Sequence, residues 1–259
     1  MPRLAANLSM MFNEVPFLDR FAAAAQAGFK GVEFLFPYDF PAADIRRRLD
    51  DNGLTQVLFN MPPGDWAKGE RGMASLPGRQ SQFRDGVKQA LDYAAALDCK
   101  LVHCMAGIPG PEVAFGTAAA LYAQNIGWAA ELAAAAGVRL CLEPINHRDM
   151  PGFHLNTMAQ AAAVIAAIGA EKVSLQFDIY HCQITEGDIT KRMELHMPII
   201  AHMQLADVPA RNEPGTGEIG WPYVFRRIDE LGYDGWIGCE YRPAGDTLAG
   251  LAWRQAFGV

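Results

Sequence analysis

The sequence predicts an α/β protein that folds as a single (β/α)8 barrel over residues 1–259. A pattern of helix, glycine, apolar strand and polar loop recurs roughly every 30 residues, which is the size of one βα unit. No Ser-, Gly- or Pro-rich linker divides the 259 residues, so one large domain is expected. A doubly wound open sheet is the main alternative fold.

The number of predicted elements favours the barrel. Eight short apolar segments are predicted as strands, at residues 4–10, 31–36, 56–60, 101–106, 139–143, 173–178, 199–205 and 236–241. Eight segments with helical patterns follow them, at residues 17–27, 42–52, 79–97, 117–136, 158–168, 190–197, 223–230 and 247–257. In a barrel of this kind the functional residues lie at the C-terminal ends of the strands.

Composition limits the kinds of molecule that the protein is expected to bind. The formal net charge of −7 argues against binding to nucleic acid or to an anionic membrane, because Lys and Arg make most contacts with phosphate. A small-molecule partner is therefore expected. The first residues lack the apolar segment of a signal peptide, and no apolar run is long enough to span a membrane. Five cysteines without a C-x-x-C pair argue against a disulfide framework and favour the reducing cytoplasm.

Four successive predicted strands alternate apolar and polar side chains. Residues two apart in a strand share a face, so one face is apolar, with Leu140, Leu142, Leu175, Phe177, Met203, Leu205, Ile237 and Cys239. The other face carries Cys141, Glu143, Gln176, Asp178, His202, Gln204, Gly238 and Glu240. In a closed barrel, three carboxylates and one amide then converge at one end of the lumen. The carboxylates would repel one another unless a divalent cation lies between them.

Three long loops are expected at the same end of the barrel, at residues 61–79, 146–154 and 207–218. Loops of this length are usually lids or binding loops. Arg71, Arg79 and Arg211 are candidates to clamp a substrate carboxylate, the alternative being an ion pair that stabilises the loop. His103 and His202 are interpreted as hydrogen-bonding groups of the barrel interior.

Several motifs at these strand ends resemble those of the hydroxypyruvate isomerase family, in the xylose isomerase-like TIM-barrel superfamily. They are Leu-Glu-Pro-Ile-Asn-His at 142–147, Phe-Asp-Ile-Tyr-His at 177–181, Glu-Pro-Gly-Thr-Gly-Glu-Ile at 213–219 and Trp-Ile-Gly-Cys-Glu-Tyr at 236–241. The similarity extends over essentially the whole chain.

The resemblance implies roles for particular residues. Glu143 and Glu240 would be the paired proton donor and acceptor, and His181 would bind substrate. The ligands of a divalent metal would be Glu143, Asp178, Gln204 and Glu240. Related ketose epimerases usually have a histidine where this chain has Gln204. A set of four oxygen ligands suits Mg²⁺ or Mn²⁺ better than zinc.

The implied reaction interconverts hydroxypyruvate and 2-hydroxy-3-oxopropanoate (tartronate semialdehyde) through a cis-enediolate, so the expected partner is a small hydroxy-oxo acid. A sister group acts on 2-oxo-tetronates, but residues 143–155 resemble the hydroxypyruvate type. A ketose 3-epimerase is the nearest further alternative. An endonuclease of the same superfamily would need more histidine ligands and a basic face. A binding barrel without catalysis and a homo-oligomer are both left open.

Overall fold

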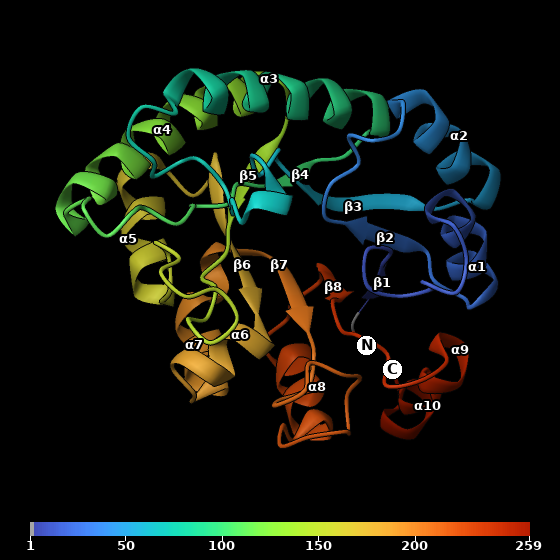
Figure 1. Cartoon of the computed structure of the whole chain (residues 1–259). Helices are drawn as coiled ribbons and strands as arrows, with labels where there is room; N and C mark the ends of the chain where they lie inside the picture. Colours follow the sequence, from blue (N-terminus) through green and yellow to red (C-terminus); the bar gives the residue numbers. More distant parts are fainter. Residues whose placement is uncertain (1–2) are drawn as a thin grey trace.

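The computed structural model describes residues 3–259 and shows a closed barrel of eight parallel strands that follow one another in sequence order (Figure 1). The strands are β1 (Arg3–Asn7), β2 (Gly31–Phe34), β3 (Thr55–Asn60), β4 (Leu101–His103), β5 (Arg139–Leu142), β6 (Val173–Asp178), β7 (Ile200–Leu205) and β8 (Trp236–Cys239). Strand β1 pairs with both β2 and β8, which closes the sheet. The predicted (β/α)8 architecture is confirmed.

Helices surround the strands on the outside of the barrel (Figure 1). They are α1 (Arg20–Gln26), α2 (Ala42–Asn52), α3 (Gln80–Leu97), α4 (Phe115–Ala135), α5 (Met158–Ile168), α6 (Ile179–Thr185), α7 (Ile189–His196), α8 (Trp221–Glu230), α9 (Thr247–Gly250) and α10 (Ala252–Phe257). Short 3-10 turns are η1 (Phe17–Asp19), η2 (Trp66–Lys68) and η3 (Met197–Ile199). Over the described part of the chain, no helix combines the length and apolar character needed to cross a membrane.

Two local features differ from the sequence prediction. Helix α6 starts directly after β6, where a loop was expected, because the Asp178 carboxylate accepts hydrogen bonds from the backbone N–H groups of Tyr180 and His181. Such a cap satisfies donors that a helix start otherwise leaves unpaired. The last predicted helix is divided into α9 and α10 at Leu251.

The core has two layers, as the alternation of residues predicts. Leu140, Leu142, Phe177 and Met203 belong to the large apolar cluster that also contains buried residues of the helices. Cys141 instead belongs to a small cluster with Ala5, Val57 and Leu58. The rest of the lumen-facing set is polar, and its buried members include Gln176, Asp178, His202 and Gln204. The five cysteines are free and buried.

Candidate active site

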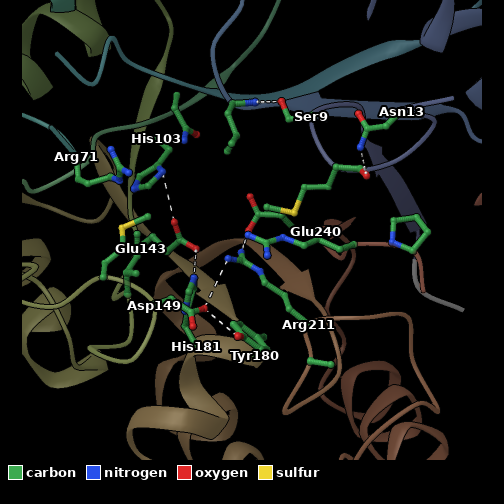
Figure 2. A pocket seen from close by; sticks show the side chains of 18 of the residues that line it. Ser9, Asn13, Arg71, His103, Glu143, Asp149, Tyr180, His181, Arg211 and Glu240 are labelled. Atoms are coloured by element: carbon green, nitrogen blue, oxygen red, sulfur yellow. Dashed lines mark hydrogen bonds and ion pairs between the residues drawn. The ribbon is translucent and has the colours of Figure 1, made fainter. Parts of the chain in front are cut away.

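A cavity of about 1010 Å³ opens at the C-terminal end of the barrel and is lined by strand-end and loop residues (Figure 2). Glu143 and Glu240 line it, as do His181 and Arg211. This is the end at which (β/α)8 enzymes carry their active sites, and the volume suits a small-molecule ligand.

Three of the predicted carboxylates meet here. One ligand atom from each of Glu143, Asp178, His181 and Glu240 lies within 4.8 Å of the others, and all four residues are buried. Glu143 follows β5, Asp178 ends β6, His181 lies in the first turn of α6 and Glu240 follows β8. The barrel thus brings together residues almost 100 positions apart, since Glu143 and Glu240 are 97 apart in the sequence.

Glu143 lies between two imidazoles (Figure 2). Its Oε2 is 3.5 Å from His103 Nδ1, and its Oε1 is 3.9 Å from His181 Nε2. Oε1 is buried and has no hydrogen-bond partner among residues 3–259. Burial raises the pKa of Glu143 well above its ordinary value, and the nearby charges of Glu240 and Asp178 raise it further. The protein alone therefore does not stabilise an ionised Glu143.

Glu240 is paired with a buried arginine. Arg211 Nη2 lies 2.5 Å from Glu240 Oε2 and 3.8 Å from Asp178 Oδ2. Burial nevertheless raises the pKa of Glu240 to about 8, against the lowering effect of Arg211. For Arg211, burial lowers the pKa, but the surrounding charges of Glu240, Asp178 and Glu143 outweigh burial and raise it overall. Arg211 remains a cation at the edge of the acidic cluster.

His181 has a defined tautomer. The side-chain amide nitrogen of Asn146 lies 2.5 Å from His181 Nδ1, so Nδ1 accepts and Nε2 carries the hydrogen. Nε2 faces Asp178 Oδ2 at 3.7 Å. Burial and the charge of Arg211 lower the pKa of His181 well below its ordinary value, which keeps the ring neutral. His181 is thus arranged as a hydrogen-bond donor, because a metal ligand would need a free lone pair on Nε2.

Gln204 is paired in register with Asp178, yet its amide is already engaged. Its Oε1 accepts from Gln176 Nε2 at 2.6 Å, and its Nε2 donates to Glu33 Oε1 at 2.8 Å. The predicted fourth ligand therefore lies beside the acidic cluster with its oxygen turned to Gln176.

Glu33, on β2, is a site residue that sequence reasoning missed. It bonds with His202 Nε2 at 2.6 Å and accepts from Asn7 Nδ2 at 2.9 Å. The same Asn7 amide also donates to Glu240 Oε1 at 3.3 Å. A Cβ at position 238 would overlap the Glu33 carboxylate, so only glycine leaves room there. The sequence offered only a weak signal, since Glu33 is a carboxylate inside a predicted strand, at residues 31–36, and does not end it as Glu143 ends its own.

The two interior histidines differ. His202 bonds with Glu33, as expected of a barrel-interior group. His103 was expected to hydrogen-bond in the same way, and this is wrong: in the described part of the chain, neither of its buried ring nitrogens has a hydrogen-bond partner. Burial, with a smaller effect of His202, lowers the pKa of His103 to about 3.

The loop arginines also differ in position. Arg71 lines the cavity, with its guanidinium 3.7 Å from the ring centre of Trp66. Arg79 is paired with Glu70 through its two terminal guanidinium nitrogens, Nη1 and Nη2, and does not line the cavity. The expectation that Arg79 clamps a substrate is thus corrected to the alternative, a loop-stabilising ion pair.

The residues present fit a divalent cation. Three buried carboxylates with raised pKa values share one space, and Glu143 Oε1 has no hydrogen-bond donor. A hard cation satisfies oxygen ligands in this situation, since it removes their mutual repulsion and replaces the missing donor.

The chain belongs to the xylose isomerase-like TIM barrel family, whose model matches residues 21–257. It is 53% identical to a 2-oxo-tetronate isomerase of Cupriavidus necator, over 99% of both chains. It is 46% identical to the hydroxypyruvate isomerase of Escherichia coli K12, over 99% of this chain and 100% of that protein. A crystal structure described as AP endonuclease, family 2, from Brucella melitensis superimposes with a TM-score of 0.96 at 50% identity, covering 99% of each chain.

Proposed function

We propose that this protein is an intramolecular oxidoreductase that interconverts hydroxypyruvate and 2-hydroxy-3-oxopropanoate. The observation that carries the proposal is the pair Glu143 and Glu240, two buried carboxyl groups that face one cavity and have oxygen atoms within 4.8 Å of each other. Carboxyl groups positioned beside a substrate carbon act as general acid and general base. The hydroxypyruvate isomerase named above, at 46% identity, supports the same reaction.

The reaction needs a proton to leave one carbon and a proton to reach its neighbour. In the forward direction a carboxylate removes a proton from the hydroxymethyl carbon, which gives a cis-enediolate. The proton of the hydroxyl group on that carbon moves to the oxygen of the adjacent carbon, and the second carboxyl group returns a proton to the adjacent carbon itself. Glu143 and Glu240 are the proposed pair. The neutral His181 Nε2–H and the Arg211 guanidinium face the same space and would donate to substrate oxygens that become negative.

Glu143, Asp178 and Glu240 would hold a divalent cation, with Mg²⁺ or Mn²⁺ the metals that suit carboxylate ligands. Gln204 is the fourth proposed ligand because of its register with Asp178, and its Oε1 would have to turn from Gln176 to the cation. When bound, the cation supplies positive charge that stabilises negative charge on the substrate oxygens.

A 2-oxo-tetronate isomerase is the second candidate. The 53% identical relative carries that name, and a cavity of about 1010 Å³ has room for a four-carbon acid. The same pair of carboxylates would move the proton on either substrate, so only the length of the preferred acid differs.

A nuclease is not favoured, although one similar structure is described as an AP endonuclease. The net charge is −7, and His181 is the single histidine in the buried cluster found in the described residues. The negative charge of this protein would repel a phosphodiester backbone, and the site offers few histidine ligands for metal ions. We further propose a cytoplasmic location, which five free, buried cysteines support.

Proton NMR in deuterated water tests the proposal. The Mg²⁺-loaded protein is incubated with hydroxypyruvate, with a 2-oxo-tetronate and with a ketohexose. We expect turnover of hydroxypyruvate with solvent deuterium entering the substrate carbon. Faster turnover of the 2-oxo-tetronate would favour the second candidate, and turnover of the ketohexose alone would contradict both.

A further inference from the structure

The β3–β4 rim, which we define as Asn60, Arg71 and His103, forms the part of the cavity wall opposite β6 to β8 in strand order. Asn60 ends β3 and His103 ends β4, and the two are paired in register. Arg71 reaches the same place because the adjacent Gly72 forms a bridge with Ala106, three residues after His103. A Cβ on Gly72 would overlap the backbone of Met105, so the loop packs directly on the segment that follows β4.

His103 is a buried donor without a partner. His103 is 1% exposed and lines the cavity, and neither ring nitrogen has a hydrogen bond to any residue that the structure describes. A buried polar group left unpaired destabilises a folded protein, so such a group in a cavity wall indicates a ligand. Nδ1 lies 3.5 Å from Glu143 Oε2, which places the group beside one of the two proposed proton carriers.

Arg71 is held in place but not neutralised. Its Nη1 donates to the backbone oxygens of Trp66 at 3.0 Å and Glu70 at 2.8 Å, and its guanidinium stacks on the Trp66 ring. Within the described residues these bonds engage Nη1 alone, which leaves Nε and Nη2 for a bidentate partner. Among residues 3–259, no carboxylate forms an ion pair with Arg71.

The other arginines that line the cavity have different surroundings. Arg211 is engaged by Glu240 and Asp178, and Arg148 donates to the Tyr180 hydroxyl and the Pro209 carbonyl. Arg242 is exposed on the β8 side of the cavity. Arg71 is thus the half-buried arginine of this wall that is both oriented and available.

We propose that the β3–β4 rim is the subsite for the carboxylate of the substrate, with Arg71 forming the ion pair and His103 donating a hydrogen bond. This inference rests on the proposed function for the identity of the acid. A carboxylate held here is paired with the positive charge of Arg71, and the carbon atoms next to it lie beside Glu143. The subsite would select a 2-oxo acid over a neutral sugar of the same length.

Calorimetric titration of the Mg²⁺-loaded protein tests the subsite without requiring turnover. The ligands are D-glycerate and glycerol, which differ by a carboxylate in place of a hydroxymethyl group. Arg71→Gln is expected to weaken glycerate binding about 10- to 100-fold, and His103→Phe about tenfold, because each removes a donor to a charged group. Neither variant should change the affinity for glycerol. Arg242→Gln is the matched control and should bind both ligands like the wild type.

Thermal unfolding separates a binding role from a structural one. His103→Phe removes two unpaired nitrogens and should unfold at a temperature no lower than that of the wild type. Arg71 lies in a half-exposed loop, so Arg71→Gln is expected to fold like the wild type. Its affinity for glycerate tests the subsite even if His103→Phe folds poorly.

Equal losses for glycerol and glycerate, or a loss in Arg242→Gln without one in Arg71→Gln, would overturn the subsite. Failure to isomerise hydroxypyruvate, with this affinity pattern intact, would contradict the proposed function and leave the carboxylate subsite standing.

Discussion

Two buried glutamates, Glu33 on β2 and Glu143 after β5, face the interior of the same barrel in opposite surroundings. Glu33 bonds with His202 at 2.6 Å, Gln204 at 2.8 Å and Asn7 at 2.9 Å. Glu143 has two imidazoles no closer than 3.5 Å, and its Oε1 has no hydrogen bond. The protein satisfies the first carboxylate by itself and leaves the second to a ligand.

The two glutamates differ in role: Glu33 holds other side chains in place, whereas Glu143 is a proposed proton carrier. Donors around Glu33 fix Gln204 and, through Asn7, the carboxylate of Glu240. Glu143, Asp178 and Glu240 instead lie so close together that their negative charges repel one another. Burial also raises the pKa of each. Unsatisfied carboxylates of this kind mark a functional site more reliably than their position in the sequence does.

The largest expected effect is on turnover. Glu143→Gln and Glu240→Gln should each lower kcat by about 10²–10⁴-fold, because each removes one of the two proton carriers. The free energy of unfolding of Glu143→Gln should not fall, since the substitution removes a poorly satisfied charge. Steady-state kinetics and urea unfolding check both statements. Turnover at the wild-type rate in either variant would remove that residue from the mechanism.

A pH dependence of stability follows from Glu240. Its pKa is about 8 in the folded protein against an ordinary value of 4.5, so the folded state binds more protons than the unfolded chain between these values. The free energy of unfolding of the metal-free protein should therefore fall as the pH rises through this window. Saturating Mg²⁺ should remove most of the fall, because it stabilises the ionised carboxylates. Urea unfolding of metal-free protein that shows stability rising over this window would contradict the assignment.

At Glu33 the main expected effect is a loss of stability, with a smaller effect on turnover. Glu33→Gln leaves His202 without its carboxylate partner and should lower the free energy of unfolding by about 1–3 kcal/mol. Its kcat should fall less than that of Glu143→Gln. Urea unfolding of the two variants side by side makes the comparison, and a Glu33 variant as stable as the wild type would show that the two glutamates do not differ as described.

The smallest effect is expected at Arg79. The side chains of Arg79 and Glu70 are 29% and 27% exposed, so Arg79→Gln should cost at most about 1 kcal/mol of stability. The KM should stay at its wild-type value because Arg79 does not line the cavity. A several-fold rise in KM would show that Arg79 takes part in substrate binding.

Much of the fold could be predicted because it depends on local patterns. Alternation along residues 139–143 and 173–178 correctly separated the helix-facing residues from those of the lumen, and it directed attention to Glu143 and Asp178. Helix α6 was missed since its cap, Asp178, also reads as the end of a strand.

Pairing across the barrel could not be predicted. Glu33 and His202 are 169 residues apart, and nothing in either segment indicates that they bond. The different states of Arg71 and Arg79 could not be predicted either, because both are arginines of the same loop. Arg79 is paired with Glu70, whereas Arg71 stacks on Trp66. The state of a charged side chain depends on partners that only the closed barrel brings together.

Titration of the metal-free protein with Mn²⁺, followed by electron paramagnetic resonance, tests most directly whether the acidic cluster is a cation site. The account predicts one Mn²⁺ per chain, weaker binding in Glu143→Gln and Glu240→Gln, and unchanged binding in Arg79→Gln. Absence of stoichiometric binding, or binding that both glutamate substitutions leave unchanged, would contradict it.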